Sequence, residues 1–296
     1  MAEETKQKLI FLWSWPRSIS TAFEKCLSFV DGVQIWHEPY TVAQFSDPTK
    51  YVQTESDVSQ GTRALIDYLK MMNSIEKERN EFSNSKLMST ASFIYQFVKS
   101  GLEQGEPGKK YILIKDMAPA ILDRFDALPN VPTRHTFVIR LSRFANFERN
   151  PADFDMCASS PVKEYFQRDA MHRIWRNVQD SGRDPHSVIV DAEDIMNHPE
   201  KILPKYLSAL GIPFDKKYLT WNASESILQT WKGALGQILV GKRSLAFDKA
   251  FKSSRFLPSP HPPPTRQELT PDVISIVDRL MPGYTEMYEH RLKPEL

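Results

Sequence analysis

The sequence predicts an α/β fold, a three-layer sandwich in which helices flank a central parallel sheet. Apolar runs of strand length recur along the chain, and stretches with helical spacing separate them. These runs are continuous rather than alternating, which indicates strands buried on both faces, as in a parallel sheet covered by helices. Strands that alternate with helices are typical of one α/β domain. The expected strands are residues 9–13, 33–36, 111–114, 136–139 and 187–190.

Helices are expected between these strands. Residues 20–30 place apolar side chains at helical spacing after the first strand. Residues 199–210 are expected to form a helix that ends at Gly211, because glycine adopts the left-handed conformation common at a helix C-terminus. Thr270 has the side chain of an N-cap and is followed by proline, so a last helix is expected over residues 270–280.

Two regions interrupt the alternation of strands and helices. Residues 41–110 show no clear strand and are expected to form a mostly helical insertion or cap over the sheet. Residues 257–264 are too rich in proline for a helix or a central strand. A stiff connector is the favoured interpretation, and a ligand for an SH3-type domain is the other. The connector is expected to cross one face of the sheet, so residues 1–296 are expected to form a single domain.

Composition and charge exclude several classes of protein. Hydrophobic residues make up 41% and charged residues 25% of the chain, which is close to an average soluble protein. This composition excludes a disordered tail protein, a collagen-like fibre and a disulfide-bonded scaffold. Lys and Arg number 38 against 37 Asp and Glu, and the net charge of +1 argues against a nucleic-acid partner.

Neither a membrane nor a metal is expected as a partner. No apolar run reaches the ~18 residues of a membrane span. The apolar run near the N-terminus is too short for a signal peptide, so a cytoplasmic protein is expected. Cys26 and Cys157 cannot form a zinc site unaided, and no Asp/His cluster has the spacing of metal ligands.

The most informative segment is residues 11–23, where an expected strand runs through a short hydroxyl-rich turn into a helix. Such a turn directs backbone N–H groups and a helix N-terminus at one point, which suits an anion. Arg17 adds a positive charge, and Ser18, Ser20 and Thr21 add hydroxyl donors. The pattern GxxxxGK[ST] is absent, which disfavours a magnesium-dependent nucleotide kinase. The alternative is a helix capped by Ser18 or Ser20 beside an exposed arginine.

This turn resembles the 5′-phosphosulfate loop of sulfotransferases, which use 3′-phosphoadenosine 5′-phosphosulfate (PAPS) and release 3′-phosphoadenosine 5′-phosphate (PAP). The chain reads Pro-Arg-Ser-Ile-Ser-Thr where the family's loop commonly reads Pro-[Lys/Arg]-Ser-Gly-[Ser/Thr]-Thr. The resemblance implies a P-loop NTPase-like sulfotransferase fold. Ile19 replaces the usual glycine, so the turn must avoid a left-handed conformation there or carry strain. The residues implied to bind the nucleotide are Pro16, Arg17, Ser18, Ile19, Ser20, Thr21 and Ala22.

Later segments extend the resemblance over most of the chain, closest to the divergent sulfotransferase-like proteins. Arg140, at the end of the fourth expected strand, resembles the arginine that binds the 3′-phosphate of the nucleotide. The family usually places a serine eight residues later, where this chain has Glu148. Ser142 and Arg143 are the candidates to replace that serine. The resemblance implies a basic loop that covers the nucleotide, with residues 232–233 or 241–244 as candidates, and for either segment alone an ordinary surface loop is the favoured interpretation.

Four polar residues follow two of the expected strands at the carboxyl edge of the sheet, where open α/β folds bind ligands. Glu38 resembles the base of Golgi-type sulfotransferases, and a carboxylate there can deprotonate an acceptor when burial raises its pKa; the alternative is a cap or an ion-pair partner. Lys115 resembles the lysine of a Lys-Asp-Pro motif in tyrosylprotein sulfotransferases and can neutralise developing charge; the alternative is a solvated lysine at a strand end. His37 is expected to be a satisfied, partly buried histidine, or else the base in place of Glu38. Asp116 is expected to orient Lys115 or to cap the next helix.

The resemblance implies a sulfotransferase that moves the sulfuryl group of PAPS to a hydroxyl or amine by in-line displacement. The acceptor is expected to be a small molecule or another hydroxyl-bearing partner. Arg17 would hold the donor, Lys115 would stabilise charge, and Glu38 or His37 would take the proton. The alternatives are a P-loop nucleotide kinase or other phosphotransferase, and a sulfotransferase-like protein that binds the nucleotide without turnover.

Overall fold

A computed structural model describes residues 7–45, 87–88, 94–141, 169–234, 238, 248–258, 265–269 and 271–295. Within them lies a seven-stranded parallel sheet with the strand order β3-β7-β2-β4-β1-β5-β6. Its strands are β1 (Lys8–Ser14), β2 (Val33–His37), β3 (Leu87–Met88), β4 (Tyr111–Met117), β5 (Thr133–Ile139), β6 (Val188–Asp191) and β7 (Lys232–Ala234). The five expected strands are confirmed. The sequence reading missed β3 and β7, because runs this short leave no apolar pattern.

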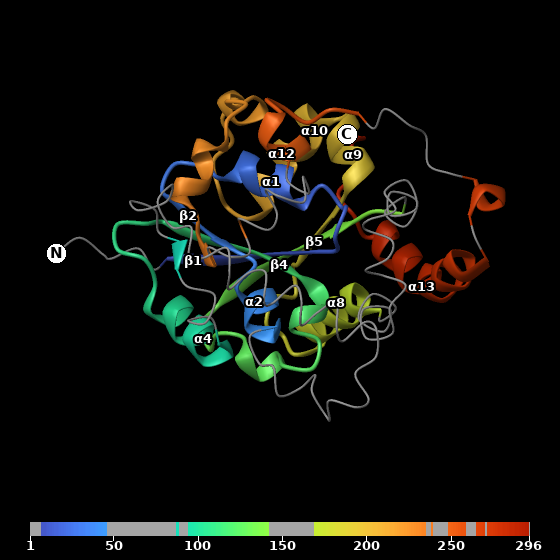
Figure 1. The fold of residues 1–296 in the computed structure, drawn as a ribbon, viewed down its shortest axis with the longest axis horizontal. Coiled ribbons are helices and arrows are strands. Elements are labelled where there is room, and N and C mark those ends of the chain that lie inside the picture. Colours follow the sequence, from blue (N-terminus) through green and yellow to red (C-terminus); the bar gives the residue numbers. More distant parts are fainter. Residues whose placement is uncertain are drawn as a thin grey trace, which may run out of the picture.

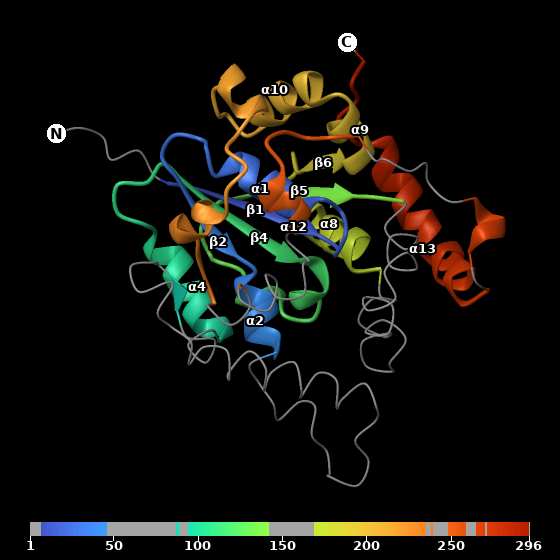
Figure 2. The ribbon, with the colours of Figure 1, turned by 45° about the horizontal axis from the view of Figure 1, so that its top comes forward.

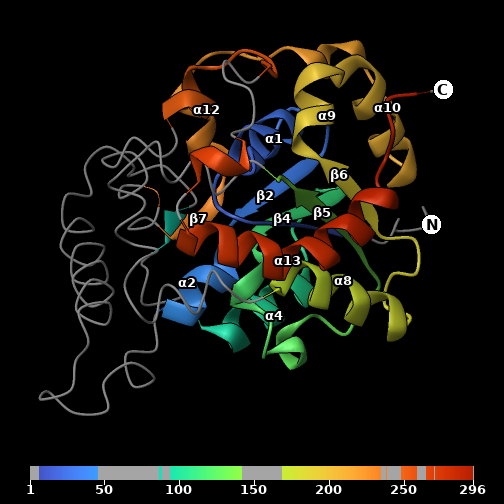
Figure 3. The ribbon, with the colours of Figure 1, turned by 90° about the vertical axis from the view of Figure 1, so that its right-hand side faces the viewer.

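Helices cover both faces of the sheet, so the predicted three-layer α/β sandwich is confirmed (Figures 1 and 3). One face carries α1 (Ser20–Leu27), α9 (Ala192–Asn197), α10 (Pro199–Ala209) and α12 (Asp248–Lys252). The other carries α2 (Pro39–Phe45), α4 (Tyr95–Gln104) and α8 (Ala170–Asp180). The 3-10 helices are η4 (Ala118–Ala120), η5 (Phe125–Ala127), η6 (Lys216–Leu219), η7 (Glu225–Thr230) and η8 (Arg266–Glu268). No helix in the described ranges is both long and apolar enough to cross a bilayer.

Successive residues of β1 divide between the two apolar layers. Phe11 and Trp13 pack on the side of α2, α4 and α8, while Ile10 and Leu12 pack on the side of α1 and α10. All four side chains are fully buried. Because strand side chains alternate between faces, a continuous apolar run fills both layers, and each such side chain contributes about 1.5–3 kcal/mol by burial. The central strands are therefore a rigid platform for whatever follows their carboxyl ends.

The last helix, α13 (Pro271–Glu289), lies beyond the carboxyl end of β5 and packs against α8 (Figure 2). The sequence reading ended this helix at Leu280, which is wrong, because the helix continues through Pro282. Gly283 allows close packing there, since a Cβ at this position would lie 2.5 Å from a carboxylate oxygen of Asp169. The expected helix stop at Gly211, with φ of 66°, is confirmed at the end of α10. Thr270 lies outside the described residues.

Candidate active site

The loop between β1 and α1 makes a tight turn that leaves the helix start open. The backbone N–H and the hydroxyl of Ser18 both donate to the carbonyl of Trp15, at 3.3 and 2.6 Å. Ile19 occupies the N-cap position of α1, and no side chain caps the first turn. The alternative of a helix capped by Ser18 or Ser20 is therefore wrong, because Ser18 turns back to Trp15 and Ser20 is already helical. The open helix start presents N–H groups and the positive end of the helix dipole to an anion.

Backbone strain gathers around this loop. In the described part of the chain, the non-glycine residues with positive φ are Arg17, Ile19 and Glu38, at 65°, 59° and 48°. A left-handed residue costs about 1–2 kcal/mol, and a β-branched side chain such as that of Ile19 makes it an outlier. Ile19 thus adopts the left-handed conformation and carries strain, the second of the two outcomes expected for it. Strain of this kind persists where the surrounding structure enforces it and is concentrated at functional sites.

Arg140 joins the end of β5 to this loop. Its Nη1 donates to the carbonyl of Arg17 at 3.0 Å, and its Nε pairs with Glu193 Oε1 at 3.0 Å. The side chain is almost buried, so the guanidinium acts as a fixed support under the turn. Burial also lowers the pKa of Arg17. Ser142, Arg143 and Glu148, and the candidate covering loop at residues 241–244, lie outside the described residues.

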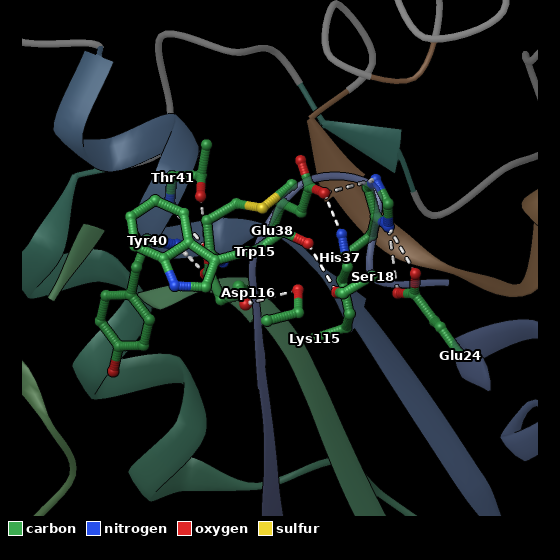
Figure 4. A network of polar contacts seen from close by, with 11 residues as sticks. Trp15, Ser18, Glu24, His37, Glu38, Tyr40, Thr41, Lys115 and Asp116 are labelled. Atoms are coloured by element: carbon green, nitrogen blue, oxygen red, sulfur yellow. Dashed lines mark hydrogen bonds and ion pairs between the residues drawn. The ribbon is translucent and has the colours of Figure 1, made fainter. Parts of the chain in front are cut away.

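Glu38 and Lys115 meet across the neighbouring ends of β2 and β4 (Figure 4). The Lys115 ammonium donates to Glu38 Oε1, and both side chains are buried. The Glu38 backbone N–H donates to the Lys115 carbonyl at 2.7 Å, which continues the pairing of the two strands past its last residue. Because β4 lies between β2 and β1, this ion pair stands beside the strand that carries the anion loop.

His37 lies deeper than the sequence suggested. We expected it to be partly buried, and that is wrong, because its side chain is fully buried. Its Nδ1 lies 3.0 and 2.9 Å from the two carboxylate oxygens of Glu24, and its ring stacks on Trp231 with centroids 5.1 Å apart. Its Nε2 lies 3.9 Å from Glu38 Oε1. The imidazole is thus held between two carboxylates.

Glu24 is a site residue that the sequence reading missed. It lies on α1, is fully buried and contacts His37 across the layer boundary (Figure 4). Burial raises the pKa of the Glu24 carboxyl, against the opposing effect of its contact with His37. The sequence held little signal for it, because Glu24 stands beside Lys25 and such a charged pair is typical of an exposed helix face.

Asp116 has a structural role. Its buried carboxylate accepts from the backbone N–H groups of Tyr40 at 2.6 Å and Thr41 at 3.0 Å, and from the Thr41 hydroxyl at 2.6 Å. It therefore caps the start of α2. This corrects the expectation that it would cap the helix following its own strand. Burial raises the pKa of Asp116 to about 7.

Lys232 and Gly233 do not form the expected covering loop. They lie in β7, where Gly233 is the register partner of His37. The Lys232 ammonium pairs with Glu106 at 2.9 Å and lies 4.1 Å from the ring centre of Trp36. The residues form a short inner strand because β2 on one side and β3 on the other supply backbone partners. The described ranges hold no group of three His, Cys, Asp or Glu side chains arranged for a metal ion.

Comparisons with known proteins leave the chain without a matching family model and without a matching curated protein. Among solved structures it is similar to the sulfotransferase domain from the curacin biosynthetic pathway, with 16% identity, a TM-score of 0.48 and coverage of 98% of this chain and 100% of that one. It is also similar to the sulfotransferase domain from the Synechococcus PCC 7002 olefin synthase, with 18% identity, a TM-score of 0.45 and coverage of 99% of each chain. A third similar structure is mouse sulfotransferase SULT7A1 complexed with PAP, with 12% identity, a TM-score of 0.47 and coverage of 97% of this chain and 90% of that one.

Proposed function

We propose that the protein is a sulfotransferase that takes its sulfuryl group from PAPS and transfers it to a hydroxyl or amine of an acceptor. One observation carries the proposal. An uncapped helix start with Arg17 in its turn lies at the end of β1, and the buried Glu38–Lys115 pair lies at the ends of the adjoining strands. The first can hold a phosphosulfate, and the second can manage the proton and charge of transfer to an acceptor.

The reaction assigns one task to each group. PAPS supplies an activated sulfuryl group on its 5′-phosphate. The acceptor oxygen forms a bond to sulfur as the bond from sulfur to the bridging phosphate oxygen breaks, and PAP leaves. Glu38 takes the acceptor's proton, and the Lys115 ammonium stabilises the negative charge on the departing phosphate. Arg17 and the first-turn N–H groups of α1 hold the anion in line, which is the main contribution of proteins to such transfers.

Nucleotide preference separates this proposal from a nucleotide kinase. We expect PAP to raise the melting temperature and ATP with magnesium to do so far less, because the loop lacks the Gly-Lys pair that cradles a triphosphate. At one hundred times its dissociation constant, a ligand adds about 2.7 kcal/mol, which gives a melting shift of several degrees. Equal shifts with the two nucleotides would contradict the proposal.

Two variants make this experiment specific to the loop. Arg17→Ala should lose most of the PAP shift, because a charged donor to a phosphate is worth about 1.5–3 kcal/mol. Lys217→Ala is the matched control, since its exposed ammonium pairs with Asp31 at the start of β2, at the opposite edge of the sheet. It should keep the full shift. Release of PAP from PAPS with a panel of hydroxyl and amine compounds then separates an enzyme from a nucleotide-binding protein without turnover.

A further inference from the structure

The described residues contain a row of four buried ionisable side chains that reaches from a helix into the site. Glu24 contacts His37 Nδ1 at 2.9 Å, His37 Nε2 lies 3.9 Å from Glu38 Oε1, and Glu38 binds Lys115. Each of the four side chains is no more than 1% exposed (Figure 4). The proposed mechanism uses only the last two. A role for the other two, Glu24 and His37, follows from counting the charges in the row.

The charges in such a row must nearly cancel. With Glu38 ionised and Lys115 protonated, their pair is neutral, and a net charge left on Glu24 and His37 would be buried without compensation at a cost of several kcal/mol. Glu24 and His37 are neutral together in two arrangements that turn no lone pair toward Glu38. Either the carboxylate faces an imidazolium, or a protonated carboxyl donates to Nδ1 of a neutral imidazole. In a third neutral arrangement a protonated carboxyl accepts from Nδ1–H, but this turns the bare Nε2 toward the Glu38 carboxylate, where two lone pairs repel. Burial raises the pKa of Glu24, which keeps the proton within the pair.

Both arrangements place a hydrogen on the same atom. The imidazolium carries one on each nitrogen, and the neutral ring that accepts at Nδ1 carries its hydrogen on Nε2. In each case an N–H group of His37 faces Glu38 Oε1, the oxygen that also binds the Lys115 ammonium. Without Glu24, the ring would be free to carry its hydrogen on Nδ1 and to turn a lone pair toward Glu38.

We propose that Glu24 is a positioning residue of the site, which fixes a hydrogen on His37 Nε2 so that Glu38 Oε1 faces this hydrogen as well as the Lys115 ammonium. The base role of Glu38 in this statement rests on the proposed function. The hydrogen on Nε2 favours the ionised carboxylate, which is the form that accepts a proton. His37 then acts through Glu38 rather than on the acceptor.

Among the described residues, the charged groups that face His37 come from three elements. Glu24 comes from α1, Glu38 follows β2 and Lys115 comes from β4. The side of β7 presents the uncharged ring of Trp231 and the backbone of Gly233. Asp116, next to Lys115, is turned toward the start of α2 by its own hydrogen bonds. A change in the pH profile of transfer caused by substitution of Glu24 can therefore be assigned to these four side chains.

The first test is nitrogen NMR of the wild-type protein with ¹⁵N-labelled histidine. We expect the His37 signal to show a protonated Nε2 at pH 7, and assignment comes from the signal lost in His37→Gln. An unprotonated Nε2 would overturn the proposal. This measurement needs no activity, so it decides the state of the pair even if no sulfuryl transfer is found. Absence of transfer with every acceptor would count against the proposed function instead.

The second test is the pH profile of transfer by Glu24→Gln. We expect kcat/KM at pH 7 to fall by about 10- to 100-fold and the acidic limb of the profile to move up by about one pH unit, because an amide can accept from Nδ1 as well as donate to it, and Nε2 then no longer carries a fixed hydrogen. PAP affinity should be unchanged. The matched control is Glu106→Gln, whose mostly buried carboxylate also accepts two bonds, from Trp36 and Lys232. It should lose stability without moving the acidic limb. An unmoved limb in Glu24→Gln would show a purely structural carboxylate.

Discussion

Two buried histidines in this sheet have the same exposure and opposite surroundings. His135 lies within β5, where Trp13 Nε1 donates to its Nδ1 at 2.9 Å and Thr133 Oγ1 lies 2.9 Å from its Nε2. Burial lowers the pKa of His135 to about 3, so the ring is neutral. His37 lies at the last position of β2 between the carboxylates of Glu24 and Glu38. Both side chains are fully buried.

The difference shows that the partners of a buried histidine, and not its burial, separate packing from chemistry. Neutral partners fix one tautomer of His135 and link β5 to β1 through the core. Acidic partners make His37 part of a unit that can hold and reposition a proton. Position on the strand decides which partners are available. The body of a strand meets other strands and apolar helices, while its carboxyl end meets loops and helix starts.

In the region around His37, we expect the largest effect on the rate of transfer from a substitution of Glu38. Glu38→Gln retains the shape of the side chain but cannot accept the proton, so transfer should fall by about 10²–10⁴-fold. The protein should be less stable because Lys115 loses its ion pair. The rate is therefore measured at saturating PAPS and per mole of protein that binds PAP.

An acceptor that is already ionised provides the control for this variant. It needs no proton removed, so it should partly restore transfer by Glu38→Gln. Transfer at the wild-type rate with an un-ionised acceptor would show that Glu38 is not the base, and His37 would then be the candidate.

In the region around His135, the substitution His135→Leu should reduce the stability of the fold and leave PAP binding unchanged. The substitution leaves the indole N–H of Trp13 and the hydroxyl of Thr133 without their partner in the core. Each lost bond costs about 1–3 kcal/mol, so the free energy of unfolding should fall by about 2–5 kcal/mol. Urea denaturation measures this loss, and PAP titration under native conditions should show wild-type affinity. A large loss of PAP binding with unchanged stability would show that His135 belongs to the binding site and is not a purely structural residue.

A smaller effect is expected in the pH dependence of stability, because His135 is held neutral in the fold. The folded-state pKa of His135 is about 3, below the unfolded value, so only the unfolded chain takes up a proton at this residue as the pH falls below about 6.5. The wild type should therefore lose about 2 kcal/mol of stability at pH 5 through this residue. His135→Leu lacks the group, so the stability difference between the two proteins should shrink by that amount between pH 8 and pH 5. A difference that stays constant with pH would mean that His135 is not held neutral in the fold.

The central strands could be predicted from the sequence because burial on both faces leaves a continuous apolar run, as in β1 and β4. The short strands β3 and β7 could not, because they span two and three residues, and each forms only on a neighbour already in place, β7 on β2 and β3 on β7. The carboxyl-edge positions of Arg17, Glu38 and Lys115 followed from where the expected strands end.

The contacts of the site could not be predicted in the same way. The pairing of Glu24 with His37 depends on how α1 lies over β2, and a strand–turn–helix pattern does not fix that packing. The Arg140 contact to the Arg17 carbonyl depends equally on tertiary structure. Ile19 shows a different limit, because a β-branched residue in the left-handed region opposes local preference and is imposed by its surroundings.

The order of strands in the sheet also bears on how the protein is made. His37 pairs with Gly233 in β7, which the ribosome reaches roughly 200 residues later, about 10–40 s at ~5–20 residues per second. During that interval the nascent chain carries β2 with an open edge, and an unpaired edge is a template for pairing with another chain. The end of β2 that carries His37 is thus completed late in synthesis. Yield of active protein should therefore depend on translation speed and chaperone supply more than the stability of the finished fold would suggest.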